Sequence, residues 1–216
     1  MMLRTGAIVV AMLCLLGACA SRTPPASRVA AAQQKPIALI DPAAACFSGL
    51  DQRHADYDRV ADFHDGQCGI DEALRMKGGA IPLNRPLLLA CPTATSLVDF
   101  EAQVVVPAAK ATLGHPVKVM TSAGSYDCRG QRSDHPERLS EHALGKAIDI
   151  TGFTLEDGSR ITVLQNWHGK DAKADFLHQV ASGACKLFSV VLTPKSNALH
   201  KDHLHLDNGP YKKCDA

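Results

Sequence analysis

A single acid set among isoleucines most constrains how this chain can fold. Asp149 lies in the apolar stretch 147–150, which is typical of a strand that enters a hydrophobic core. Burying an unpaired carboxylate there is costly, so a compensating group must lie against Asp149. His142 and Gly145 precede this strand within the segment 140–150, SEHALGKAIDI. We therefore expect a buried polar site beside the strand.

A second alternation of polar and apolar residues lies near the C-terminus. In 203–207, HLHLD, an extended chain places both histidines and the aspartate on one face and both leucines on the other. The segment 147–151 alternates in the same way. Laid side by side, the two strands would bring Asp149 and His205 together, and His142 could close a third side.

These three side chains form a familiar ligand set. Two histidines and one carboxylate, with water in the fourth position, make a catalytic zinc site. We therefore predict that His142, Asp149 and His205 bind Zn²⁺, which would compensate the charge on Asp149. Gly145 suits a tight approach or a positive φ between His142 and the strand.

The N-terminus predicts export and lipidation. A positive start is followed by the apolar run 7–16, which is too short to span a bilayer, and then by small residues before Cys19. We predict a lipoprotein signal peptide over 1–18 with Cys19 as the lipidated residue, and a disordered tether over 19–44. No acid follows Cys19, which by resemblance to known lipoproteins favours the periplasmic face of the outer membrane. A soluble periplasmic or secreted protein is the alternative.

Cysteine usage fits an exported protein. An even number of further cysteines predicts three disulfides and leaves their pairing open. The absence of a C-x-x-C motif argues against a zinc ribbon or a redox protein. The six are Cys46, Cys68, Cys91, Cys128, Cys185 and Cys214.

The order of the predicted elements indicates an α+β domain over 45–216, with a small, mostly antiparallel sheet flanked by helices. Segment 40–92 reads as irregular, with short extended pieces at 81–83 and 87–90. Helices are expected at 95–113, where Pro107 predicts a kink or break, and at 171–182. Strands are expected at 117–120, 146–153, 160–164, 187–192 and 204–206. A net charge of +1 without a basic stripe argues against a nucleic-acid partner.

The motif S-x-H-x2-G-x-A-x-D over 140–149 resembles the signature of zinc D-alanyl-D-alanine peptidases. Their superfamily includes lysostaphin-type enzymes and the hedgehog signalling domain. More closely, residues 45–216 resemble the bacterial extensin-like C-terminal domain family. The matching pieces are 124–129, 139–150 and 200–207. This resemblance implies zinc bound by His142, Asp149 and His205 in a small α+β fold.

The resemblance also implies a mechanism. Zinc would polarise a scissile carbonyl and activate water, and a nearby base would take the proton. That base is His203 by strand alternation, or Asp202 if the strand bulges there. Arg129 is the expected partner of the developing oxyanion or of a substrate carboxylate.

The function expected from these features is hydrolysis of a D-Ala-containing bond in peptidoglycan peptides, as a carboxypeptidase or an endopeptidase. The membrane would be contacted through the lipid anchor only. The alternative is a non-catalytic, zinc-containing module of the hedgehog type that binds cell wall or protein. The sequence leaves the oligomeric state open.

Overall fold

The computed structural model describes residues 41–131 and 137–216. The predicted signal peptide, Cys19 and most of the predicted tether lie outside the described residues. Helix α1 (Pro42–Gln52) begins inside that tether, because the Asp41 side chain accepts a hydrogen bond from the amide of Ala43 and Pro42 opens the first turn. The tether prediction was therefore wrong for 42–44. Within the described ranges, every helix is too short or too polar to cross a bilayer.

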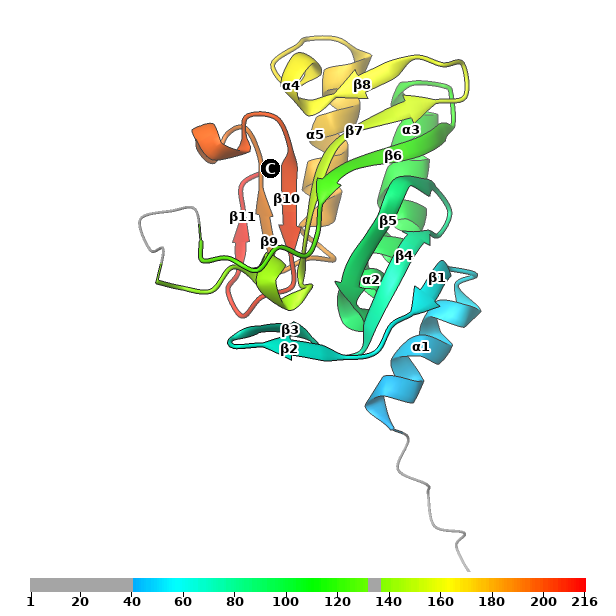
Figure 1. Ribbon diagram of the computed structural model, residues 1–216. Helices are drawn as coiled ribbons and strands as arrows, with labels where there is room; N and C mark the ends of the chain where they lie inside the picture. The colour runs from blue at the N-terminus through cyan, green and yellow to red at the C-terminus, as the bar shows by residue number, and fades with distance from the viewer. Residues whose placement is uncertain (1–40, 132–136) are drawn as a thin grey trace, which may run out of the picture. The chain divides into compact units, whose positions relative to one another are not determined.

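One mixed sheet forms the framework of the described part of the chain (Figure 1). Its strand order is β1-β4-β5-β6-β7-β10-β9-β11, and β8 also pairs with β7. Neighbours are antiparallel except for the parallel pairs β5–β6 and β9–β11. The bounds are β1 (Asp56–Arg59), β4 (Ala73–Gly78), β5 (Pro82–Ala90), β6 (Val117–Gly124), β7 (Ala147–Leu155), β8 (Arg160–Thr162), β9 (Val190–Leu192), β10 (Leu204–Asp207) and β11 (Lys213–Cys214).

The α+β class is confirmed, but the prediction of a small sheet was wrong, since nine strands join it. Segment 40–92 supplies three of them, together with the separate hairpin β2 (Phe63–Asp65) and β3 (Cys68–Ile70). Strand β5 was not predicted in full because it contains prolines. Pro82 opens the strand, and β5 pairs with β6 only at Leu83, so the missing amide hydrogens are tolerated.

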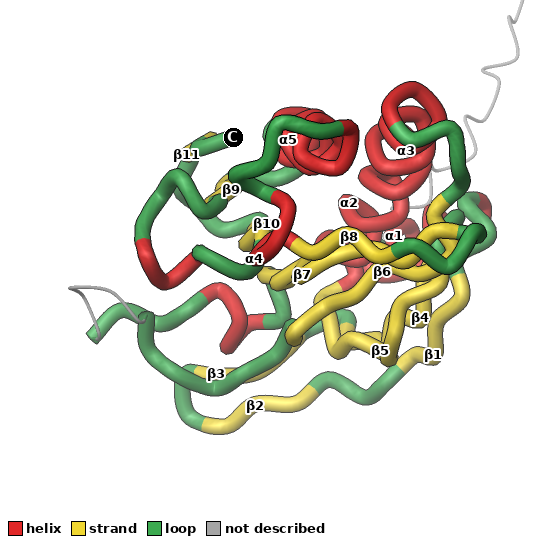
Figure 2. The backbone as a smooth tube through the Cα atoms, turned by 90° about the horizontal axis from the view of Figure 1, so that it is seen from above, coloured by secondary structure: helices red, strands yellow, loops and turns green. Residues whose placement is uncertain are grey.

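Helices α2 (Cys91–Phe100), α3 (Val106–Thr112) and α5 (Ala172–Ala184) cover one face of the sheet (Figure 2). The short helix α4 (Val163–Asn166) follows β8. The apolar faces of α2, α3 and α5 pack onto side chains of the strands to form the main core, which includes Leu97, Phe100, Ile150, Phe153 and Phe176. The predicted helix at 95–113 is a continuous helical stretch in the structure, with a π turn at Glu101–Val105. Pro107 follows this π turn, in which the amide of Val106 donates to the carbonyl of Glu101, and stands in the first turn of α3.

Strand β7 changes neighbours halfway along its length. Its first half pairs with β10 and its second half with β8. Between them, Thr151 is an extra residue against β6, where the register shifts at Thr121 and Ser122. This bulge resets the alternation, so that Asp149, Thr151 and Thr154 all lie on the face away from the helices, while the core receives Ile148, Ile150, Phe153 and Leu155.

Three disulfides are present, as predicted. Cys46–Cys91 joins α1 to the start of α2, Cys68–Cys128 joins β3 to the segment after β6, and Cys185–Cys214 joins the end of α5 to β11. Each closes a loop of 29 to 60 residues and so restricts the unfolded chain.

Candidate metal centre

Strands β7 and β10 lie side by side and antiparallel, as the two alternations predicted (Figure 1). Asp149 and His205 are directly opposite each other in the register. Leu204 and Leu206 are fully buried on the helix side, which fixes the other face of β10 as the one that carries His205. The sheet therefore holds an acid and an imidazole together on its open face.

His142 comes from a 3-10 turn, Glu141–Leu144, that precedes β7. Ser140 caps this turn by accepting a hydrogen bond from the amide of His142. Gly145 ends it with φ of 63°, and a Cβ there would lie 2.5 Å from Ile70 Cδ1 and 2.9 Å from a backbone nitrogen. The expectation that this glycine allows a positive φ and a close approach is thus confirmed, and the turn directs His142 at the strand.

Three donor atoms converge on one point. Asp149 Oδ1 is 3.0 Å from His205 Nδ1 and 3.3 Å from His142 Nε2, and the two nitrogens are 3.2 Å apart. Tetrahedral zinc with bonds of about 2.0–2.1 Å separates its ligand atoms by about 3.3 Å. The side chains of His142, Asp149 and His205 are 4, 18 and 13% exposed, so the cluster is largely shielded from water. Their arrangement fits a divalent cation.

On His142 and on His205, the outer ring nitrogen, which points away from the cluster, makes a hydrogen bond of its own. His142 Nδ1 donates to the backbone carbonyl of Ser125, and His205 Nε2 donates to Asp207 Oδ2 at 3.0 Å. In the neutral rings these bonds fix the proton on the outer nitrogen and leave a lone pair on the inner one. Two lone pairs and a carboxylate oxygen then face one another without a hydrogen between them. A cation resolves this arrangement.

The local charges also favour a cation. Burial opposes ionisation of Asp149, but hydrogen bonds and charge from His142 and His205 outweigh it and hold the pKa of this carboxyl far below its usual range. When His205 is protonated instead, the hydrogen on its Nδ1 takes the position of the cation: burial opposes the charged ring, yet hydrogen bonds to Asp149 and Asp207 raise its pKa to about 9. The two carboxylates therefore create a strongly negative potential at the cluster.

The two candidate bases turn out to be partners. His203 Nδ1 lies 2.9 Å from Asp202 Oδ1, and His203 Nε2 lies 3.6 Å from Asp149 Oδ1. The imidazole of His203 thus stands between Asp202 and the cluster, where its Nε2 can exchange a proton with a bound molecule. Asp202 orients that ring.

A cavity of about 360 Å³ opens onto the cluster, and Arg129 is among its lining residues. Arg129 Nε donates to Asp127 Oδ2 at 2.7 Å, and the amide of Ser140 donates to the carbonyl of Arg129. The neighbouring disulfide Cys68–Cys128 ties this segment to β3. Arg129 therefore lies where it can meet a ligand at the cluster.

Other lining residues were missed or misread from sequence. Asp207 shares its strand face with His205, which could have marked it as the partner of that histidine. Glu141 lines the cavity with Oε2 buried and unbonded, and burial, followed by the charge of Asp207, raises its pKa. Burial and nearby histidine charges lower the pKa of His200 to about 4, and its Nδ1 lies 2.8 Å from Asn197 Oδ1.

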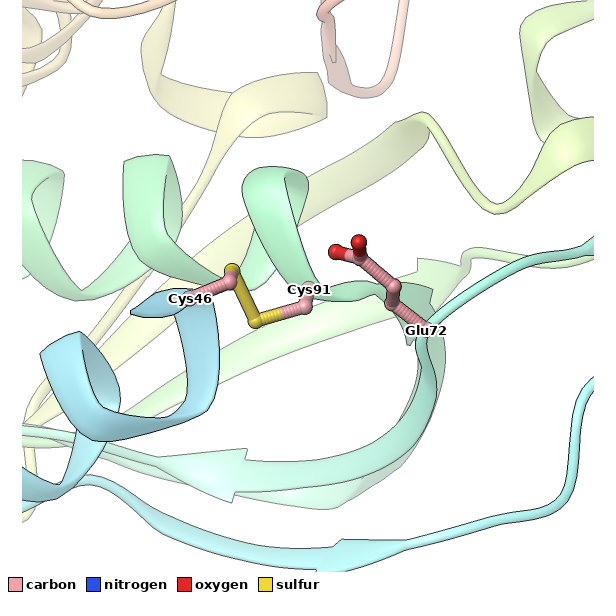
Figure 3. Close-up of side chains that lie close together, drawn as sticks. All are labelled: Cys46, Glu72 and Cys91. Atoms are coloured by element: carbon pink, nitrogen blue, oxygen red, sulfur yellow. A yellow bond between two sulfur atoms is a disulfide. The ribbon is translucent and has the colours of Figure 1, made fainter. Parts of the chain in front are cut away.

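A second group of candidate metal-binding side chains, Cys46, Glu72 and Cys91, lies where β4 begins and β5 ends (Figure 3). Its two sulfurs are joined in a disulfide, with the carboxylate of Glu72 beside it. A disulfide sulfur is a poor ligand compared with a thiolate. Within the described residues, His142, Asp149 and His205 are therefore the better metal site.

A known protein family accounts for most of this chain. Among curated proteins, and among solved structures, none matches this chain. The sequence matches the family described as "Extensin-like protein C-terminus" over residues 44–215, a span that contains the candidate metal centre and all six disulfide cysteines. The chain therefore belongs to the extensin-like C-terminal family.

Proposed function

We propose that this protein is a zinc-dependent peptidase that hydrolyses a D-Ala-containing bond in peptidoglycan peptides. The observation that carries the proposal is the convergence of His142 Nε2, Asp149 Oδ1 and His205 Nδ1, with both outer histidine nitrogens already committed. The motif over 140–149 supports kinship with zinc D-Ala-D-Ala peptidases and a fold of the hedgehog type.

Zinc, when bound, would polarise the scissile carbonyl and make water more acidic. His203 would accept the proton of that water at Nε2 and return it to the leaving amine, while Asp202 holds the ring through Nδ1. Arg129 would bind the developing oxyanion or a substrate carboxylate from the wall of the cavity. Asp207 would keep His205 in the tautomer that leaves Nδ1 free.

The anchor remains part of the proposal. A lipid on Cys19 would hold the enzyme at the periplasmic face of the outer membrane, within reach of peptidoglycan. Labelling with a radioactive fatty acid tests this: the wild type should incorporate label and Cys19→Ser should not. Label-free, released wild-type protein would instead indicate a soluble periplasmic or secreted form.

The function is tested with the full-length protein in detergent and purified sacculi. We expect the zinc-loaded protein to release new amine or D-Ala products, identified by mass, and a chelator to abolish them until zinc is restored. His203→Ala should retain about one equivalent of zinc and lose turnover, with a rate loss of about 10²–10⁴. Zinc-loaded wild type that yields no product would contradict the peptidase and leave the non-catalytic binding module.

A further inference from the structure

The open face of the sheet carries a second cavity of about 600 Å³. It lies over β6, β7 and β8, opposite the face covered by the helices, and both cavities have a size typical of ligand sites. Much of its lining is made of hydroxyl-bearing side chains, namely Thr121, Thr151, Thr154 and Thr162. None of the three proposed metal ligands, His142, Asp149 and His205, lines this cavity.

The second cavity begins where the first one ends. Asp149 lines the first and Thr151 lines the second, and both point outward from the same strand, two residues apart. Asp202 lines the second cavity, while its carboxylate bonds to His203, which lines the first. The Asp202–His203 pair is therefore a wall shared by the two cavities.

Exposed apolar side chains gather at these two cavities. Four large apolar residues are exposed in the part of the chain that the structure describes, and three of them line a cavity. Leu199 and Tyr211 belong to the first and Leu164 to the second, so only Val106 lies elsewhere. Apolar groups at the edges of both cavities favour one elongated ligand that contacts both.

We propose that the two cavities form a single cleft that crosses the metal site, so that the enzyme is an endopeptidase cutting within long or cross-linked peptides. This inference rests on the proposed peptidase function. Removal of one terminal residue needs space for the chain on one side of the scissile bond and only a small pocket on the other. Here His203 lines one sizeable cavity, and its partner Asp202 lines another. Oppositely charged Asp202 and Arg160 in the second cavity suit a polar chain of low net charge.

The test compares two peptidoglycan fragments, a cross-linked dimer and an uncross-linked pentapeptide monomer, with the full-length, zinc-loaded protein in detergent. Contacts in the second cavity should raise kcat/KM for the dimer at least about tenfold above that for the monomer. Thr154→Trp fills this cavity from an outward position on β7 and should lower dimer cleavage by at least about tenfold, without changing zinc content. Gln179→Trp is the matched control, since it adds the same ring to the exposed side of α5.

Folding of each variant is checked by circular dichroism. Should Thr154→Trp misfold, Leu164→Asp replaces it, because Leu164 is 59% exposed and can change without disturbing the core. The single-cleft proposal would be overturned if the wild type prefers the monomer, or if a folded variant of the second cavity cuts the dimer at the wild-type rate. Either result would leave the peptidase proposal intact. If the zinc-loaded wild type cuts neither fragment, both proposals fall.

Discussion

Asp207→Asn should weaken zinc binding without disturbing the fold. Asp207 uses Oδ1 to accept the amide of Gly209 at 2.8 Å and Oδ2 to accept His205 Nε2 at 3.0 Å. An asparagine that keeps the first bond must present its NH₂ group to His205. The imidazole then has to accept at Nε2 and carry its hydrogen on Nδ1, the atom that faces Asp149 and His142.

The expected loss follows from this tautomer change. Removing such a partner of a metal-binding histidine costs about 10–100-fold in affinity, equivalent to about 1.4–2.8 kcal/mol. The affinity is measured by competition with a chromophoric chelator. At saturating zinc, the free energy by which zinc stabilises the fold should drop by the same amount in urea titrations.

The matched control is Asp202→Asn, which removes the same charge from a residue that contacts His203 and no proposed ligand. Asp202 is about half exposed, so its loss should change affinity by less than about fivefold. Equal zinc affinities for Asp207→Asn and wild type would refute the tautomer argument. Equal losses of affinity in Asp207→Asn and Asp202→Asn would show a general effect of charge instead.

Three further predictions concern stability. Burial raises the pKa of Glu101 from 4.5 to about 7 against backbone hydrogen bonds that lower it, so the folded state binds the proton more tightly than the unfolded one. The contribution of Glu101 is thus greatest below pH 4.5 and decreases by about 3 kcal/mol as pH passes 7; urea titrations should lose this slope in Glu101→Gln, and parallel profiles would contradict it. Gly145→Ala should cost more than the about 1–2 kcal/mol expected for its backbone conformation alone, whereas Gly158→Ala, also at positive φ but in open space, should cost only that strain; equal losses would exclude the close approach. Replacing Cys68 and Cys128 together by serine should lower the free energy of unfolding by about 4 kcal/mol for a 60-residue loop, and a loss below about 1 kcal/mol would mean that the bridge constrains little.

The strands of the candidate site were predictable because alternation is a local property. Two short segments carried enough pattern to pair Asp149 with His205 across β7 and β10. The position of the His142 ring was less determined, since it depends on a hydrogen bond from its Nδ1 to the carbonyl of Ser125. A backbone carbonyl has no signature in the sequence, so this contact could not be foreseen.

The first third of the domain was harder to predict for a different reason. Strands β1, β4 and β5 are stabilised by pairing with one another, while β1 contains two aspartates and β5 two prolines, residues that usually mark loops. The parallel pair β5–β6 is a further tertiary choice that no local pattern encodes. Disulfide pairing was equally out of reach, because six cysteines allow many combinations.

The alternation in β10 makes this strand intolerant of changes in length. Leu204 and Leu206 pack into the core, and this packing directs His205 and Asp207 to the opposite face of the strand. Inserting or deleting one residue would reverse both sets together, exposing hydrocarbon and driving two polar groups inward. Evolution or engineering can therefore exchange side chains along β10, but loop-length variation has to be confined to the segments on either side of it.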